Sequence, residues 1–118
     1  MNQPCTNHNS YSEQMDAAMS GKALRYNSGK PQLSIITEAN YALAGLAEVL
    51  EYGANKYARS NWLKGLTDVN CIDSLLRHLV KYQSGELIDP ESGCHHLDHV
   101  LANALFLAHH HNGKNTNS

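Results

Sequence analysis

The chain has 118 residues, which is enough for one domain with an ordinary core and too few for two. Apolar residues make up 42% of the sequence and charged residues 17%, as in globular proteins, and the formal net charge is −2. This charge excludes a strongly basic nucleic-acid-binding protein, and no apolar run reaches the roughly 18 residues that would span a bilayer. We therefore expect no direct nucleic-acid binding and no membrane association.

Residues 1–20 are polar and poor in large apolar side chains, so we expect a disordered N-terminal tail. They lack the basic-then-apolar order of a signal peptide. The three cysteines, Cys5, Cys71 and Cys94, are odd in number and scattered, which indicates free thiols in a reducing compartment. Together these features predict a cytoplasmic protein.

A loop and a first helix follow the tail. Residues 25–31 combine Asn-Ser-Gly turn chemistry with Lys30 before a proline, which predicts an ordered loop or short arm with cationic side chains. The first helix is predicted over about 37–54, with Thr37 as its N-cap and Gly53 near its end. Its buried stripe is expected to consist of Leu43, Leu46, Ala47, Leu50 and Ala54.

Two more helices are predicted. The second runs from Asp68, as N-cap, to Ser84-Gly85, with a buried stripe of Ile72, Leu75, Leu76 and Leu79. The third covers about 94–111 and stops at Asn112-Gly113, with an apolar face of Leu97, Val100, Leu101, Ala104, Leu105 and Ala108. Because no strand-like alternation persists, we predict an all-α helical bundle in residues 21–111, followed by a disordered tail over 112–118.

Glu48 and Glu51 are the most informative charged pair, three residues apart on the flank of the first helix. Side chains at i and i+3 share a helical face, so both carboxylates can reach one point in space. Converging carboxylates repel one another unless a cation lies between them, and a hard divalent cation, Mg²⁺ or Mn²⁺, is the usual solution. The alternative interpretation is a pair of solvated charges, which is common on amphipathic helices.

Six of the eight histidines follow residue 94. His96, His99 and Asn103 share a face of the third helix that differs from its apolar face, so the two imidazoles could ligate one metal ion. One alternative is that they are surface histidines. Another is a zinc site formed with Cys94, which would need its fourth ligand from the second helix.

Two further segments supply candidate contacts for a nucleotide. Lys56, Asn61 and Trp62 lie in and beside the loop after the first helix, where the indole offers a flat face for stacking on a purine. A buried core position is the alternative for Trp62. Asp73 and Arg77, four residues apart on the second helix, form either a simple ion pair or a phosphate-binding arginine with its orienting carboxylate.

Six short motifs follow one another along about residues 24–109. They are Arg25-Tyr-x-x-Gly29-Lys30-Pro31, Glu48-Val-Leu-Glu51-Tyr-Gly-Ala-x-Lys56-Tyr57, Asn61-Trp62, Arg77-His78, Asp89-x-Glu91-Ser-Gly93 and His96-Leu-x-His99-x-x-x-Asn103-Ala-Leu-Phe106-Leu. In order and spacing, these motifs resemble the dATP/dGTP diphosphohydrolase family, MazG-like proteins common in bacteriophages that include the MazZ enzymes.

The resemblance implies an all-α nucleoside triphosphate pyrophosphohydrolase that cleaves between the α- and β-phosphates, and a homo-oligomer, a dimer or tetramer, with its site near a subunit interface. In the wider superfamily, Glu-x-x-Glu on one helix faces Glu-x-x-Asp on a later helix. Glu48 and Glu51 match the first element, and His96 and His99 stand in the register of the second. Because imidazole favours Mn²⁺, Co²⁺ or Zn²⁺, the identity of the ion stays open between these metals and Mg²⁺.

We therefore expect a pyrophosphohydrolase that converts purine dNTPs (dATP or dGTP) to dNMP and pyrophosphate. Glu48 and Glu51 are its expected catalytic residues and, with His96 and His99, its expected metal ligands. The expected substrate contacts are Lys30, Lys56, Asn61, Trp62, Asp73, Arg77 and Asn103. Two alternatives are a histidine/aspartate-type phosphohydrolase that releases intact triphosphate, and a helical module that binds nucleotide or metal without turnover.

Overall fold

The computed structural model describes residues 21, 23–26 and 28–116, so the tail predicted over residues 1–20 lies outside the described residues. The chain divides between Glu38 and Ala39 into two units. The described part of the first unit contains one 3₁₀ helix, η1 (Leu33–Glu38), with no buried residue. Thr37 lies inside η1, where its hydroxyl donates to the Ser34 carbonyl oxygen at 2.6 Å.

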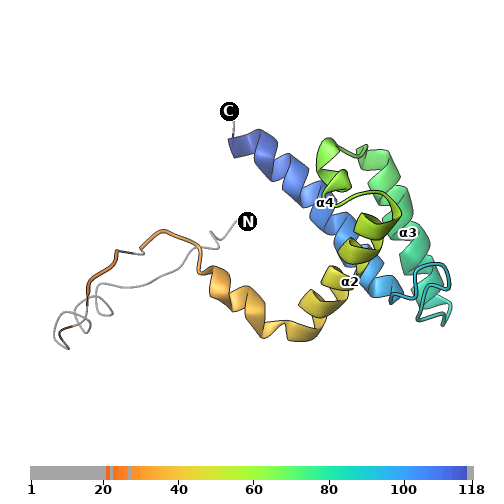
Figure 1. Ribbon diagram of the computed structural model, residues 1–118, viewed down its shortest axis with the longest axis horizontal. Coiled ribbons are helices and arrows are strands. Elements are labelled where there is room, and N and C mark those ends of the chain that lie inside the picture. The colour runs from red at the N-terminus through yellow and green to blue at the C-terminus, as the bar shows by residue number, and fades with distance from the viewer. Residues whose placement is uncertain (1–20, 22, 27, 117–118) are drawn as a thin grey trace. The chain divides into compact units, whose positions relative to one another are not determined.

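The second unit consists of helices (Figure 1). Its three α-helices are α2 (Asn40–Lys56), α3 (Asp68–Gln83) and α4 (His96–Thr116), and a 3₁₀ helix, η2 (Asn61–Lys64), lies between α2 and α3. The described residues contain no strand, only an isolated antiparallel bridge between Ile88 and His95. The predicted all-α class with three main helices is confirmed, and no described helix has the length and apolar character needed to cross a membrane.

The N-caps differ from those predicted. Thr37 does not cap α2, because the residue before its first turn is Ala39 and no side chain caps it. Asp68 does not cap α3 either: Thr67 is the N-cap, and its hydroxyl accepts a hydrogen bond from the Asn70 amide at 3.2 Å. Asp68 is then the first helical residue, where a carboxylate interacts favourably with the helix dipole.

Helix α4 also departs from its prediction at both ends. It begins at His96 and continues through Asn112 and Gly113 to Thr116, so the predicted stop at these two residues is wrong and residues 112–116 are helical. In Figure 1, α4 crosses the unit and packs on both other helices, more extensively on α3 than on α2.

The core of this unit is small. A buried cluster consists of Val49 on α2, Cys94 just before α4 and Ala102 on α4. Leu46, Tyr52 and Phe106 pack around it. Cys71 and Cys94 are buried free thiols, as predicted, and burial raises the pKa of Cys71. Cys5 lies outside the described residues.

Glycine allows α2 and α4 to approach closely. A Cβ placed on Gly45 would overlap the carboxylate of Asp98, so the Asp98 side chain lies directly against the α2 backbone. Gly45 and Val49, one turn apart, are the buried residues of α2. Of the predicted stripe, Ala47 is exposed, and the other four members are half-buried.

The buried face of α4 is opposite in character to the one predicted. His96, His99, Ala102 and Asn103 are buried, whereas Leu97, Leu101, Ala104 and Ala108 of the predicted apolar face are exposed. The polar residues can be buried because each side chain finds a hydrogen-bond partner, and no described buried side-chain polar atom lacks one.

Helix α3 likewise exposes much of its predicted buried stripe. Ile72 and Leu76 are 44% and 49% exposed, while Leu75 and Leu79 are half-buried. Val69, Ile72, Leu76 and Val80 instead form an exposed apolar row, spaced three and four residues apart. This row is called the α3 apolar row below.

Candidate functional site

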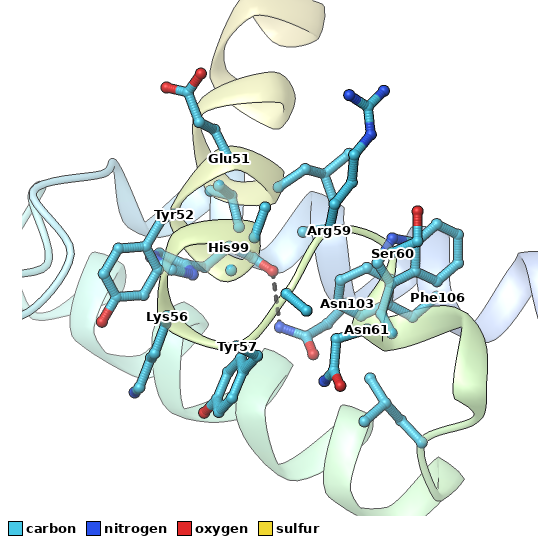
Figure 2. A pocket seen from close by; sticks show the side chains of 18 of the residues that line it. Glu51, Tyr52, Lys56, Tyr57, Arg59, Ser60, Asn61, His99, Asn103 and Phe106 are labelled. Atoms are coloured by element: carbon cyan, nitrogen blue, oxygen red, sulfur yellow. Dashed lines mark hydrogen bonds between the residues drawn. The ribbon is translucent and has the colours of Figure 1, made fainter.

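A pocket of about 600 Å³ opens between the C-terminal half of α2, the loop that follows it and α4 (Figure 2). Its volume is in the range of small-molecule sites. Six residues expected at the site from the sequence line the pocket: Glu51, Lys56, Asn61, Trp62, His99 and Asn103. All six belong to the second unit.

The charged side chains stand at the rim of the pocket. In Figure 2, the carboxylate of Glu51 and the guanidinium of Arg59 extend on one side of the view and the ammonium of Lys56 on the other. Lys56 Nζ lies 3.5 Å from Glu91 Oε1 and near the rings of Tyr52 and Tyr57. Glu91 is the main cause of the raised pKa of Lys56, so this ammonium stays charged at neutral pH.

The aromatic wall of the pocket is formed by Trp62. Its ring stacks on Phe106 with a centroid distance of 4.9 Å, and its carbonyl oxygen lies 3.2 Å from His110 Nε2. Trp62 is half-buried and lines the pocket, so it packs on α4 and also borders the cavity.

Asn103 lies at the buried end of the pocket, and its amide orientation is fixed. Its Nδ2 group donates to Ser74 Oγ at 3.1 Å and to the His99 carbonyl oxygen at 2.9 Å, the bond drawn in Figure 2. Both amide hydrogens are used in these two bonds. The side-chain oxygen of Asn103 is therefore the group that can accept a hydrogen bond from a ligand.

Ser60, on the pocket wall, has a left-handed backbone conformation with φ 64°. It is the only described non-glycine residue with positive φ. Such a conformation costs on the order of 1 kcal/mol and persists where the surroundings impose it, which is common at functional sites. Asn61 and Trp62 follow Ser60 directly, so the backbone conformation of Ser60 determines the positions from which their side chains extend.

A chain of hydrogen bonds runs beneath the pocket from the connector between α3 and α4. Glu86 Oε2 lies 2.8 Å from His96 Nε2, and His96 Nδ1 lies 2.8 Å from His78 Nδ1. A carboxylate can only accept, so His96 carries its proton on Nε2 and its Nδ1 accepts from the Nδ1–H of His78. The order Glu86–His96–His78 therefore leaves Nε2 of His78 without a proton.

A second set of bonds joins the connector to His99. Ser92 Oγ donates to Asp89 Oδ2 at 2.9 Å and lies 2.6 Å from His99 Nε2, while His99 Nε2 and Asp89 Oδ2 are 3.5 Å apart. The connector is held in place because the Asp89 carboxylate also accepts from the Glu91 amide and the Asp89 carbonyl from the Gly93 amide. Gly93, with φ 75°, supplies the left-handed residue that this turn requires.

The electrostatics of this cluster favour neutral imidazoles beside a carboxylate. Burial is the largest cause that lowers the pKa of His78, to about 4, and it also lowers the pKa of His99. For Asp89, burial alone would raise the pKa, but the hydrogen bonds from Ser92 and Glu91 and the nearby His99 outweigh it and lower the pKa. At neutral pH the cluster therefore holds one negative charge, on Asp89, and two neutral imidazole rings, each with one ring nitrogen that carries a proton and one that does not.

One ligand atom from each of His78, Asp89 and His99 lies within 4.8 Å of the others. Among the described residues, no comparable group contains Glu48 or Glu51. Both glutamates are exposed on α2, and the described residues include no ion-pair partner for either. The two helices thus carry the expected metal ligands in different surroundings: exposed carboxylates on α2 and buried, hydrogen-bonded imidazoles on α4.

Comparison with known proteins gives the same family as the motifs. Residues 20–118 match the family model of the dATP/dGTP diphosphohydrolase N-terminal domain. The chain belongs to this family.

One curated relative is the dATP/dGTP diphosphohydrolase of Salmonella phage PMBT28, which is 31% identical to this chain over 84 residues. The aligned part is 71% of this chain but 28% of the relative, so the chain spans little more than a quarter of that protein. No solved structure matches significantly.

Some residues expected at the site of this family member do not line the pocket. Glu48, Asp73 and Arg77 are exposed on their helices and are absent from the pocket wall, and no ion pair joins Asp73 to Arg77 in the described part of the chain. Lys30 is exposed in the first unit. Glu51 is therefore the member of the carboxylate pair that reaches the pocket.

The sequence does not identify Asp89 and His78 as candidate metal ligands. Asp89 stands in the Asp89-x-Glu91-Ser-Gly93 motif, but its position before a proline favoured a turn residue. In the sequence, His78 stands out only as part of the short motif Arg77-His78. The missing signal is the pairing of the connector with α3 and α4, which spacing within one helix does not contain.

Proposed function

We propose that this chain acts on purine deoxynucleoside triphosphates, dATP or dGTP, and hydrolyses them to the monophosphate and pyrophosphate. The family supports this proposal, as does the name of the phage relative. The observation that carries it here is the pocket, which brings a carboxylate, two cations, an indole and a fixed amide to one cavity of nucleotide size.

Glu48 and Glu51 are the proposed ligands of Mg²⁺ or Mn²⁺. They fit a hard divalent ion because both are carboxylates, both are exposed, and neither is neutralised by a cationic side chain in the described residues. When bound, the ion would offset triphosphate charge and acidify a water molecule. Glu51, which reaches the pocket, is proposed to take the proton of the water that attacks the α-phosphorus.

The other pocket residues are proposed to orient the substrate. Lys56 and Arg59 offset the negative charge of the phosphates at the rim, and Trp62 offers a stacking face for the base. The oxygen of Asn103 can accept from an exocyclic amine of a purine, and Asn61 from the sugar or base.

Lys30, Asp73 and Arg77 remain proposed substrate contacts, although none lines the pocket. For Asp73 and Arg77 the proposal includes a homo-oligomer, a dimer or tetramer, in which α3 of one copy approaches the pocket of another. The exposed α3 apolar row, on the same helix, supports such an assembly.

Product analysis of the purified chain tests the activity. Incubation with each dNTP and Mg²⁺ or Mn²⁺ is expected to release monophosphate and pyrophosphate, with purine nucleotides preferred. Glu51→Gln is expected to lower kcat by at least about a hundredfold, because an amide cannot accept the proton. The control Asp68→Asn removes a carboxylate at the start of α3, outside the pocket, and should retain activity.

One observation favours a second candidate. The grouping of His78, Asp89 and His99 is the kind of histidine/aspartate cluster that a triphosphohydrolase would use. That enzyme would release nucleoside and intact triphosphate, so the products separate the two functions. Nucleotide binding with no product in any metal would instead support a non-catalytic module, and either result would refute the pyrophosphohydrolase proposal.

A further inference from the structure

The hydrogen-bonded cluster beneath the pocket has a use that the proposed hydrolysis does not require. Its three potential ligand atoms come from three segments: His78 from α3, Asp89 from the connector and His99 from α4. We propose that these three side chains bind a borderline transition-metal ion, of the Zn²⁺ or Co²⁺ class, at a site separate from Glu48 and Glu51.

The spacing of the ligands fits a small ion. Zinc bonds to nitrogen and oxygen are about 2.0–2.2 Å long, so two ligands of a tetrahedral ion are about 3.3–3.5 Å apart. His99 Nε2 and Asp89 Oδ2 are 3.5 Å apart already, and the remaining separations are no larger than 4.8 Å. The rings of His78 and His99 are stacked nearly parallel, with centroids 4.1 Å apart and an angle of 4° between their planes. Because a ligated ion lies in the plane of each imidazole ring, binding requires one of the two rings to rotate out of this stack.

Hydrogen bonds set the tautomer of His78, the proposed ligand on α3. The carboxylate of Glu86 sets the tautomer of His96, and His96 in turn accepts the Nδ1 proton of His78. Nε2 of His78 consequently presents a lone pair. A metal-bound histidine ordinarily donates its other ring N–H to such an acceptor, which fixes the ring and raises its basicity.

In the absence of an ion, Ser92 satisfies the hydrogen-bonding groups of His99 and Asp89. Its hydroxyl oxygen accepts from His99 Nε2–H and its proton goes to Asp89, so it lies between two of the proposed ligands. On metal binding His99 changes to the Nδ1–H tautomer, in which the Nε2 proton is lost to solvent and Nδ1 takes one up, and the Ser92 hydroxyl or a water molecule in its place becomes the fourth donor. The side chains of His99 and Asp89 are only 10% and 14% exposed, so water competes weakly for the ion.

The donor set selects the class of metal. Two imidazole nitrogens and one carboxylate oxygen suit Zn²⁺ and Co²⁺, whereas Mg²⁺ prefers oxygen ligands and retains its waters. The bound ion would connect the connector to α3 and α4, the pair of helices with the most extensive packing, directly below the pocket that His99 lines.

Cobalt spectroscopy on the full chain tests this site. The protein is stripped with a chelator and titrated with Co²⁺ in the absence of nucleotide, so that the result does not depend on hydrolysis. One equivalent per chain is expected, with the intense visible absorption of four-coordinate Co²⁺; Zn²⁺ should displace it and excess Mg²⁺ should not.

Variants locate the bound ion. Asp89→Asn, which is nearly isosteric, and His78→Asn should each weaken Co²⁺ affinity by at least about a hundredfold, more than the loss of a supporting residue. Glu86→Gln changes a positioning residue whose side chain is 41% exposed, and it should weaken affinity about tenfold while the protein remains folded. Circular dichroism of each variant confirms that it is folded.

The histidine run 109–111 is the competing site, and His111→Asn is the matched control. His111 is exposed and contacts Asp68, far along the chain from the cluster. Unchanged Co²⁺ affinity in Asp89→Asn and His78→Asn, or loss of binding in His111→Asn, would overturn the proposal. A spectrum typical of six-coordinate Co²⁺ would overturn it as well.

Discussion

At the scale of single residues, His78 is surrounded by groups that oppose its protonation. Its ring stacks on His99 at a centroid distance of 4.1 Å and its Nδ1 contacts His96, and Arg77 lies nearby. Asp89 is the nearby group that favours the charged form, and it is outweighed. The folded chain therefore holds a histidine that is neutral where an unfolded histidine would begin to charge.

Stability of the metal-free protein is expected to fall with acidification. The pKa of His78 is about 4 in the folded state, below the value of 6.5 for an unperturbed histidine. The unfolded chain therefore binds the proton first, and stability is lost as pH falls from 6.5 towards 4. After allowance for partial exposure, the loss is on the order of 2 kcal/mol, and the lowered pKa of His99 adds in the same direction.

Urea unfolding at pH 7.5 and pH 5, in chelator, measures this loss. His78→Asn should flatten the dependence, whereas His109→Asn, which changes an exposed histidine, should leave it as in the parent chain. Equal stability of the parent chain at the two pH values would contradict the prediction.

At the scale of elements, the close contact of α2 with α4 depends on one position. Gly45 and Asp98 meet there, and the carboxylate occupies the space that a larger residue would need. A glycine inside a helix costs about 1 kcal/mol relative to alanine, so its presence here reflects packing rather than helix propensity.

Gly45→Ala is expected to destabilise the parent protein by about 1–3 kcal/mol, because the new methyl group forces Asp98 out of its position. In an Asp98→Ala background the same change should stabilise by up to about 1 kcal/mol, since only the gain in helix propensity remains. Urea unfolding of the four variants gives the cycle. The same effect of Gly45→Ala in both backgrounds would exclude the contact as its cause.

The helices themselves could be predicted from apolar periodicity, but their ends and faces only in part. Thr67 and Asp68 can both cap a helix, and only the reach of Thr67 to the Asn70 amide decides between them. His96 and His99 read as a polar outer face because their partners lie in other segments. Glu86 and Ser92 come from the connector, and the family motifs, rather than spacing, indicated that this region belongs to the site.

At the scale of the whole molecule, the amount of exposed apolar surface is large for the small core. Ile72, Leu76 and Val80 of the α3 apolar row are 44–61% exposed, and Leu97 and Leu101 on α4 are exposed as well. Contiguous apolar rows of this kind are typical of interfaces. They agree with the proposed homo-oligomer, which would bury side chains that the sequence pattern assigned to a core.

The chain is expected to elute as an oligomer, with a mass by light scattering that is a multiple of the mass of one chain. The double variant Ile72→Glu/Leu76→Glu places charges in the α3 apolar row and should shift the protein to monomer. Lys81→Glu changes the charge of the same exposed helix without removing apolar surface, and it should remain oligomeric. A monomeric parent chain, or an unchanged mass in the double variant, would refute the assembly.

The ion pair between Lys56 and Glu91 has a consequence for how a phosphate would enter. Lys56 is at the pocket rim, and Glu91 belongs to the connector that also carries Asp89. Both partners are largely in solvent, at 43% and 70% exposure, so the pair is screened and readily exchanged. A phosphate with more than one negative charge can replace Glu91 as the partner of Lys56, and the exchange of ion-pair partners would release the connector from α2 at the moment the pocket fills.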